Sequence, residues 1–224
     1  MNNINLKSVI ITAILSLTII AYSNHFNNVF HFDDTHTVVQ NAYVRDLKNI
    51  PLFFTDGATS SVLPQNQVYR PVVSTSIAID YWIGKGYAPF YFHLSMFILF
   101  LIQGAFIFLL FSKILETTTA AEYKFYIAAC AAGWYLIHPA IAETVNYVIA
   151  RSDMLSTFFM MGGFILYQYF PKQRRYYIYL IPVIIGCLAK PPAVLFAPLL
   201  AMYILFFEEQ LGFCLLYTSP SPRD

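Results

Sequence analysis

The chain has 224 residues, of which 58% are hydrophobic, 18% aromatic and 11% charged. Soluble domains usually carry about 25% charged residues, so this composition is typical of an integral membrane protein. The formal net charge of +1 argues against nucleic acid as a partner. Cys130, Cys187 and Cys214 show no metal-ligand spacing, and the first two lie in apolar runs as expected core residues.

Six apolar segments predict helices that cross a membrane, since a span needs about 20 mostly apolar residues. The expected fold is therefore all-α, a polytopic helix bundle with about six transmembrane helices. Several segments are short, so their ends must extend into flanking polar residues. The tripeptide Ala21–Ser23 resembles a cleavage site, so the first segment has a second interpretation as a signal peptide. The segments are Leu6–Ser23, Pro89–Phe111, Phe125–His138, Met154–Phe170, Tyr176–Ala189 and Ala193–Phe207.

Basic residues in short loops predict the orientation of the bundle, because they are retained on the cytoplasmic side. With strict alternation, the basic loops fall on one side of the membrane. Residues 24–88, 138–153 and 190–192 then fall on the extracytoplasmic side, whether or not the first segment is cleaved. The basic residues are Lys7, Lys113, Lys124, Lys172, Arg174 and Arg175.

The first loop, residues 24–88, contains two apolar stretches that predict helices lying along the membrane face. They are NIPLFF (Asn49–Phe54) and VVSTSIAIDYWIG (Val72–Gly84). At the other end of the chain, Cys214–Asp224 resembles the translation of a sequencing adapter and is left out of the fold prediction. Residues 1–213 are accordingly expected to be the N-terminal part of a longer membrane domain.

Two adjacent carboxylates, Asp33 and Asp34, follow the first apolar segment in the stretch VFHFDDTHTVVQN. Three interpretations are open. The pair could begin a helix, whose N-terminus favours acidic side chains, or ligate a hard divalent cation. One of the two could instead act as a general base toward an acceptor hydroxyl. The motif Tyr69–Arg70–Pro71 closes the same loop and adds a cation.

A second polar group lies in the stretch IHPAIAETVNYVIARSDMLSTFF. His138 ends the third apolar segment, Glu143 follows, and Arg151 and Asp153 begin the fourth. If residues 139–150 form one helix, Glu143 and Arg151 lie about two turns apart on the same side of it. The group either holds a tight turn together, with Asp153 capping the next helix, or binds a ligand. In the second case Arg151 could grip a phosphate through two hydrogen bonds.

A third group is the stretch CLAKPPAVLFAP, in which Lys190 lies between two apolar runs. Its ammonium either extends to the membrane interface or meets a lipid phosphate, and the Pro191–Pro192 pair predicts a sharp turn that places it. His93 begins the second apolar segment near the same side. An interfacial histidine with ordinary hydrogen bonds and a proton carrier are both open for it.

Taken in order, these motifs resemble the N-terminal half of a type C membrane glycosyltransferase. The pattern is similar to that of the transmembrane O-mannosyltransferases acting on cadherins and of their bacterial relatives with tetratricopeptide repeats. The matching blocks are FDD (Phe32–Asp34), YRP (Tyr69–Pro71), PFYFH (Pro89–His93), HPAIAETVNYVIARSDMLS (His138–Ser156) and LAKPPAV (Leu188–Val194). Pro191 departs from the Lys-Glu of animal members and favours a bacterial plasma membrane over the endoplasmic reticulum.

The resemblance implies a metal-independent, inverting transfer of a sugar from a polyprenyl phosphate to an acceptor protein or glycan outside the cytoplasm, with mannose as the first candidate for the sugar. Asp33 is implied as the base and Asp34 as the residue that orients either the acceptor or its partner base. Arg70, Arg151 and Lys190 are implied to bind the donor phosphate, where charge develops in the transition state. No cofactor is implied. Supporting roles fall to Tyr69, His93, His138, Glu143 and Asp153.

Two other functions remain open. A transporter or flippase of lipid-linked sugars would place ionisable groups at mid-span, whereas here they gather at the ends of the segments. A membrane anchor for a C-terminal tetratricopeptide domain would leave Asp33, Arg151 and Lys190 without a role. The pair Gly162–Gly163 fits a transporter but is more simply explained by close helix packing.

Overall fold

The computed structural model describes residues 5–116 and 121–208. Within these ranges every regular element is helical and no strand occurs, which confirms the all-α fold class. The predicted adapter, Cys214–Asp224, lies outside the described residues.

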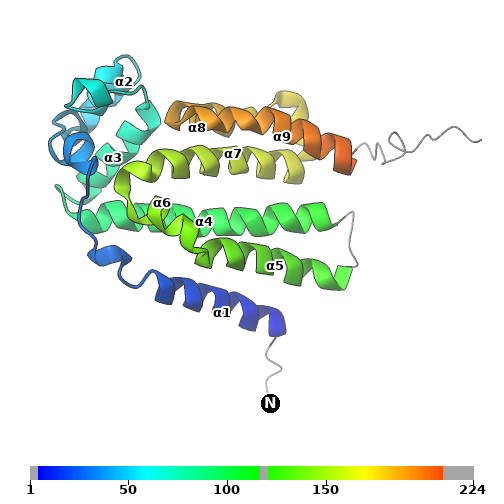
Figure 1. Cartoon of the computed structure of the whole chain (residues 1–224). Coiled ribbons are helices and arrows are strands. Elements are labelled where there is room, and N and C mark those ends of the chain that lie inside the picture. Colours follow the sequence, from blue (N-terminus) through cyan, green and yellow to red (C-terminus); the bar gives the residue numbers. More distant parts are fainter. Residues whose placement is uncertain (1–4, 117–120, 209–224) are drawn as a thin grey trace, which may run out of the picture.

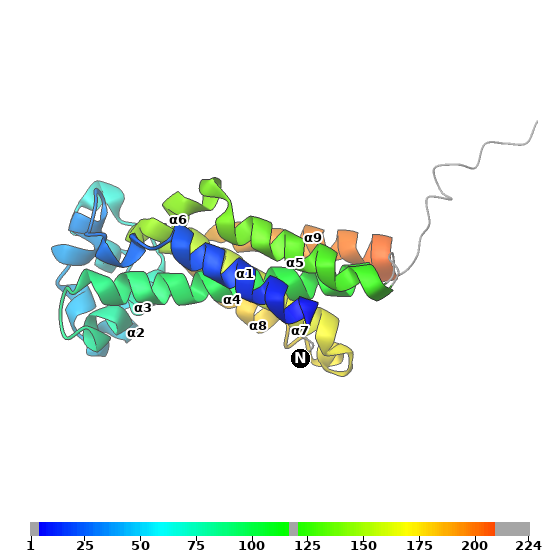
Figure 2. The same cartoon turned by 90° about the horizontal axis from the view of Figure 1, so that it is seen from below.

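Six helices form the bundle and run alongside one another in Figure 1. α4 and α7 are central, because α4 contacts both α5 and α7 while α7 also contacts α8. α1 lies on the outside of the bundle against α5, as Figure 2 shows. The bounds are α1 Leu6–Ala21, α4 Pro89–Leu115, α5 Ala121–Ile137, α7 Arg151–Tyr169, α8 Leu180–Ala189 and α9 Phe196–Tyr203.

Fewer of these helices can span a membrane alone than the sequence predicts. In the described part of the chain four helical stretches are long and apolar enough, and a fifth arises if Tyr123–Ile137 and Pro139–Asn146, bent by 51°, count as one. α8 has 10 residues and is about 15 Å long, half of a hydrocarbon core. The expected span Tyr176–Ala189 was too long because the backbone turns through residues 177–179, with Tyr177 at φ 56°, so α8 begins only at Leu180.

The predicted grouping of the polar loops at one end of the bundle is visible in Figure 1. α1, α5 and α8 end there, and α4, α7 and α9 begin there. Residues 24–88, the short α6 (Ala142–Asn146) and the turn after Lys190 therefore share one end. We call it the loop end.

Both apolar stretches of the first loop are helical, as predicted. They form α2, Ile50–Phe53, and α3, Pro71–Ile83. Proline at the first position of α3 suits a helix start, because its fixed φ matches the helix. The N–H that proline lacks would have no hydrogen-bond partner at this position in any residue. Val73 and Ile77 of α3 are buried in one cluster with residues of the bundle, so α3 fixes the loop onto the helices.

Close packing explains one of the two adjacent glycines of α7. A Cβ on Gly163 would lie 2.6 Å from Val183 Cγ2 and 2.9 Å from the carbonyl oxygen of Tyr179, so Gly163 lets α8 pack closely on α7, as the expectation of close helix packing requires. Gly162 has no such neighbour, since its nearest atom would lie at 3.8 Å. Cys130, by contrast, is exposed on α5, so its expected core position was wrong.

Candidate functional site

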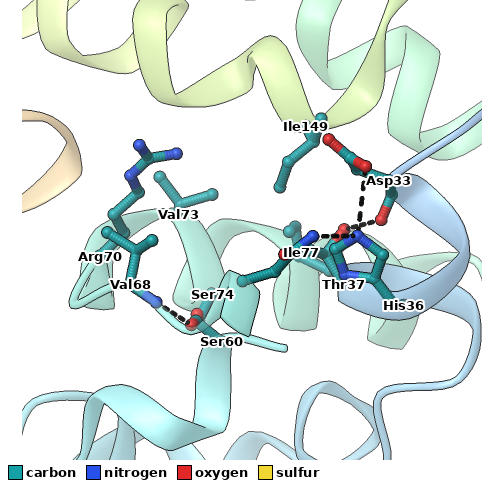
Figure 3. A pocket seen from close by; sticks show the side chains of 11 residues that line it. Asp33, His36, Thr37, Ser60, Val68, Arg70, Val73, Ser74, Ile77 and Ile149 are labelled. Atoms are coloured by element: carbon teal, nitrogen blue, oxygen red, sulfur yellow. Dashed lines mark hydrogen bonds and ion pairs between the residues drawn. The ribbon is translucent and has the colours of Figure 1, made fainter. Parts of the chain in front are cut away.

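A pocket of about 230 Å³ lies at the loop end, between the first loop, α3 and the turn before α7. Figure 3 shows Asp33 on one side of it and Arg70 on the other, with Ile149 near Asp33. The pocket is lined by Asp33, His36, Thr37, Ser60, Asn66, Val68, Arg70, Val73, Ser74, Ile77 and Ile149. It therefore joins a carboxylate and a guanidinium from two distant sequence motifs.

Asp33 faces the pocket with a carboxylate that is 59% exposed. His36 Nε2 lies 3.2 Å from Asp33 Oδ1, and the backbone N–H of Asp33 donates to the hydroxyl of Tyr147 at 3.1 Å. The preceding residue, Phe32, has φ 45°, a left-handed conformation that costs a non-glycine residue about 1–2 kcal/mol. The left-handed turn at Phe32 and these two contacts place the Asp33 carboxylate at the mouth of the pocket.

Asp34 has a different environment from its neighbour. It is 1% exposed, and its oxygens accept hydrogen bonds from the backbone N–H groups of His31 at 3.0 Å and Ile149 at 2.9 Å. Burial raises the pKa of the Asp34 carboxyl above its ordinary value, while these two hydrogen bonds and the charge of Arg151 oppose the shift. Asp34 thus fastens the first loop to the turn before α7.

Arg70 reaches the opposite side of the pocket from the residue before α3. Its Nη1 donates to Ser152 Oγ at 3.4 Å, while its buried Nε has no partner in the described structure. Tyr69 is 49% exposed and donates its hydroxyl to the carbonyl of Phe54 at 3.0 Å, which positions the loop before α3. Arg70 therefore retains donors that an anion in the pocket could use.

Lys190 and Asp153 pair with each other at the loop end. Lys190 Nζ lies 2.6 Å from Asp153 Oδ1, with the two side chains 28% and 50% exposed. Lys190 ends α8 in an extended conformation, and its carbonyl accepts a hydrogen bond from Ser156 Oγ at 3.0 Å. Asp153 lies in the first turn of α7 but does not cap it, because the N-cap is Ala150. Such an exposed pair contributes about 0–1 kcal/mol, so an anion could displace the carboxylate.

Arg151 is buried in an ion pair with Asp80 rather than directed into the pocket. Its Nη1 donates to Asp80 Oδ2, and its Nη2 donates to the carbonyl of Phe92 at 3.0 Å and to Ser95 Oγ at 3.1 Å. The side chains of Arg151 and Asp80 are 1% and 5% exposed. With these partners, Arg151 links α7 to α3 and α4.

Residues 139–150 do not form one continuous helix. A 3-10 turn and α6 are followed by Tyr147 in an extended conformation, so Glu143 and Arg151 are not on one helical face. Glu143 is exposed in the first turn of α6. His138 caps its own turn, accepting a hydrogen bond at Nδ1 from the N–H of Ala140 at 3.2 Å.

His93 is fully buried in α4, and neither ring nitrogen has a hydrogen-bond partner in the described structure. Its ring lies 4.9 Å from that of His25, whose Nε2 contacts the carbonyl oxygen of His93 at 2.8 Å. His93 does not line the Asp33 pocket. Its expected supporting role would therefore act through packing against His25–Asn27, the 3-10 turn that follows α1.

Three residues at this end were not anticipated from the sequence. His36 contacts Asp33 and also Ser61 Oγ at 2.9 Å, Asn66 contacts His36 at 3.0 Å, and Asp80 pairs with Arg151. His36 lies one helical turn after Asp33, so its spacing carried a usable signal. Asp80 is the only charged residue in its apolar stretch, Val72–Gly84. Burying an unpaired carboxylate is costly, so this position predicts a buried cationic partner.

The charged side chains of the pocket suit proton transfer and anion binding. Across residues 5–116 and 121–208, no group of three His, Cys, Asp or Glu side chains is arranged to hold a metal ion. A carboxylate at the mouth and a guanidinium across the pocket can accept a proton and bind an anion, respectively. The fold and this pocket define an all-helical, polytopic membrane protein with a polar site at one end of its bundle.

The chain has sequence similarity to a curated protein. The chain is similar to protein O-mannosyl-transferase TMTC3 of Homo sapiens, with 25% identity over 170 residues, which cover 75% of this chain and 17% of that protein. This similarity supports a distant relation to that protein. No protein-family model matches the chain, and no solved structure matches it.

Proposed function

We propose that the chain forms part of a membrane glycosyltransferase that transfers a sugar, with mannose as the first candidate, from a polyprenyl phosphate to a hydroxyl of a protein or glycan. The pocket would lie on the extracytoplasmic side of the membrane, a bacterial plasma membrane being the first choice. The observation that carries the proposal is the placement of Asp33 and Arg70 on opposite sides of one pocket. The distant relation to an O-mannosyl-transferase supports it.

Asp33 is the proposed general base. As the acceptor oxygen forms its bond to the anomeric carbon, Asp33 takes the hydroxyl proton, and the electron pair of the breaking bond passes to the lipid phosphate oxygen. Attack from the side opposite the phosphate inverts the anomeric centre and requires no covalent sugar intermediate. The exposed Asp33 carboxylate is accessible for this step, whereas Asp34 is buried and engaged by backbone N–H groups.

Arg70 is the proposed phosphate ligand, and Lys190 is proposed to assist it from the turn after α8. A guanidinium can bind phosphate through two parallel hydrogen bonds, and it stabilises the charge that grows on the leaving oxygen. Arg151 is now assigned to positioning, because its donors already face Asp80, Phe92 and Ser95. Tyr69 and Asp34 would hold the two sides of the pocket in place.

The test separates chemistry from donor binding. Sugar transfer is measured for the longest form of the protein that its gene encodes, using polyprenyl-phosphate mannose and hydroxyl-bearing peptides. Binding of polyprenyl phosphate to the 224-residue chain in lipid nanodiscs is measured by native mass spectrometry. The variants are Asp33→Asn, Arg70→Gln and Lys190→Gln, with Asp46→Asn as the matched control, an exposed loop aspartate that does not line the pocket.

Asp33→Asn is expected to lower transfer by about 10²–10⁴-fold, the usual contribution of a general base, while donor binding stays within about twofold. Arg70→Gln should weaken donor binding, with a smaller loss for Lys190→Gln, since a charge-assisted hydrogen bond contributes more than a solvated pair. Asp46→Asn should match the parent in both measurements. Transfer by Asp33→Asn at the parent rate would refute the base assignment, and unchanged binding by Arg70→Gln would refute the phosphate site.

A further inference from the structure

A second hollow, of about 500 Å³, lies at the end of α3 and shares no residue with the Asp33 pocket. It is lined by Arg45, Tyr81, Trp82, Ile83 and Lys85. Two cations and three large apolar or aromatic side chains thus meet in one place, on a part of the chain that the proposed transfer reaction does not use.

This hollow lies next to the start of α4, a helix long and apolar enough to cross a membrane. Lys85 lies in the turn between α3 and α4, just before Pro89 begins the 27-residue apolar helix α4. Trp82 is 66% exposed and Ile83 49% exposed. Tryptophan gathers at membrane–water interfaces because its ring is apolar with one polar edge, so these exposed side chains suit contact with lipid better than contact with water.

Both cations of the hollow are available to an anion. Arg45 is held by hydrogen bonds from Nε to the Tyr87 hydroxyl at 2.7 Å and from Nη2 to the carbonyl of Val39 at 3.3 Å. Lys85 makes no side-chain hydrogen bond or ion pair within the described residues. Its φ of 52°, followed by φ 142° at Gly86, makes the tight turn that keeps it beside α3.

Neither cation forms an ion pair with a carboxylate within the described residues. Asp80, two residues before Trp82 on α3, is buried and paired with Arg151. Asp46, next to Arg45, accepts a hydrogen bond at Oδ1 from the N–H of Lys48 at 2.9 Å. The hollow therefore combines positive charge with exposed apolar surface at the start of a membrane span.

We propose that this hollow binds the phosphate headgroup of an anionic membrane phospholipid, whose acyl chains lie against Trp82 and Ile83. Lys85 and the free edge of the Arg45 guanidinium contact the phosphate. A peptide partner would need the apolar surface to face away from the membrane, and the short link to α4 argues against that orientation. This inference is independent of the proposed transfer reaction.

The sequence provides an internal reporter for this site. The chain has two tryptophans, Trp82 and Trp134, so Trp134→Phe leaves Trp82 as the sole one. In nanodiscs of phosphatidylcholine with a minor fraction of phosphatidylglycerol, bromine is placed on the acyl chains of one lipid or the other. Bromine quenches tryptophan fluorescence on contact, so comparing the two labellings at equal brominated fraction measures lipid preference at Trp82.

Trp82 is expected to be quenched more by brominated phosphatidylglycerol than by brominated phosphatidylcholine, because each basic residue near an anionic surface favours association by about fivefold. The Trp82→Phe protein, which reports from the exposed Trp134, should show no such preference. Lys85→Gln and Arg45→Gln should each reduce the preference at Trp82. Lys48→Gln, which removes an exposed lysine outside the hollow, should leave it unchanged.

Lys85→Gln is the decisive variant, because this side chain holds no other described group in place and its loss should leave the fold intact. Equal quenching by both lipids at Trp82, or a preference that persists in Lys85→Gln and Arg45→Gln, would overturn the proposal. Added polyprenyl phosphate provides a further arm. If it displaces phosphatidylglycerol from Trp82 at a much lower mole fraction, the site binds the isoprenoid lipid and the phospholipid assignment is wrong.

Discussion

Replacing Asp80 with asparagine is expected to destabilise the protein more than any other single aspartate substitution at the loop end. The change removes the charge that faces Arg151 but keeps the size of the side chain. Arg151 would remain a buried cation, with the Phe92 carbonyl and neutral hydroxyl groups as its remaining acceptors. The perturbation therefore tests whether this ion pair holds α3, α4 and α7 together.

The magnitude follows from the burial of the pair. With side chains 1% and 5% exposed, solvent screens the interaction little, and removing one partner of such a pair costs about 3–5 kcal/mol. Ser95 Oγ, which donates to Asp80 Oδ2 at 2.6 Å, can still bond to asparagine, so the lower figure is the better choice. For a chain of this length, about 3 kcal/mol corresponds to a fall of about 6–12 °C in Tm.

Thermal unfolding in detergent, followed by circular dichroism, measures this change for Asp80→Asn, Arg151→Met and the double variant. The double variant should be more stable than the sum of the single effects by about 2 kcal/mol or more, because no unpaired charge remains. Asp153→Asn is the matched control, since its exposed pair with Lys190 is worth no more than about 1 kcal/mol. Additive single effects, or equal melting of Asp80→Asn and Asp153→Asn, would refute the reasoning.

Two further predictions concern the same end of the bundle and the α7–α8 contact. Burial raises the pKa of Asp34 above its ordinary value of 3.8. The folded protein therefore keeps the Asp34 carboxyl protonated at pH values where the unfolded chain has already ionised it. The stability due to this group is therefore full below about pH 3.8 and falls as the pH rises through the folded-state pKa. The Tm of the parent minus that of Asp34→Asn should decrease over this window in melts from about pH 4 to 7, and a difference that grows with pH would contradict the sign. Separately, Gly163→Ala should lower stability by about 1–3 kcal/mol through overpacking against Val183 and Tyr179. Gly162→Ala, with open space around its Cβ, should be neutral or gain up to about 1 kcal/mol from helix propensity, and equal melting of the two alanine variants would show that α8 does not restrict α7.

The long helices were predictable because their signal is local. A run of about 20 apolar residues is sufficient to indicate a span, and α1, α4 and α7 begin or end near the predicted positions. α8 was predicted too long because residues 176–179, three tyrosines and Ile178, count as apolar, although the backbone there turns, with Tyr177 at φ 56°. Composition alone does not distinguish an apolar turn from an apolar helix.

The site was harder to predict because its contacts join distant parts of the chain. Two adjacent aspartates look equivalent in the sequence, yet Asp33 is exposed and Asp34 is buried. The difference arises from Ile149, a partner 115 positions away. Arg151 was expected to face a ligand because its buried partner Asp80, 71 positions earlier, shows no local pattern that connects the two.

The link between Asp34 and Ile149 has a consequence for how the protein is made. At synthesis rates of about 5–20 residues per second, the 115 positions between them take about 6–23 s to emerge from the ribosome. During that interval Asp33 and Asp34 have been synthesised, but the turn before α7, whose Ile149 N–H binds Asp34, has not. The pocket is therefore completed only after α4 and α5 have been synthesised. A chaperone of membrane-protein insertion would meet the first loop before Asp34 has found its partner.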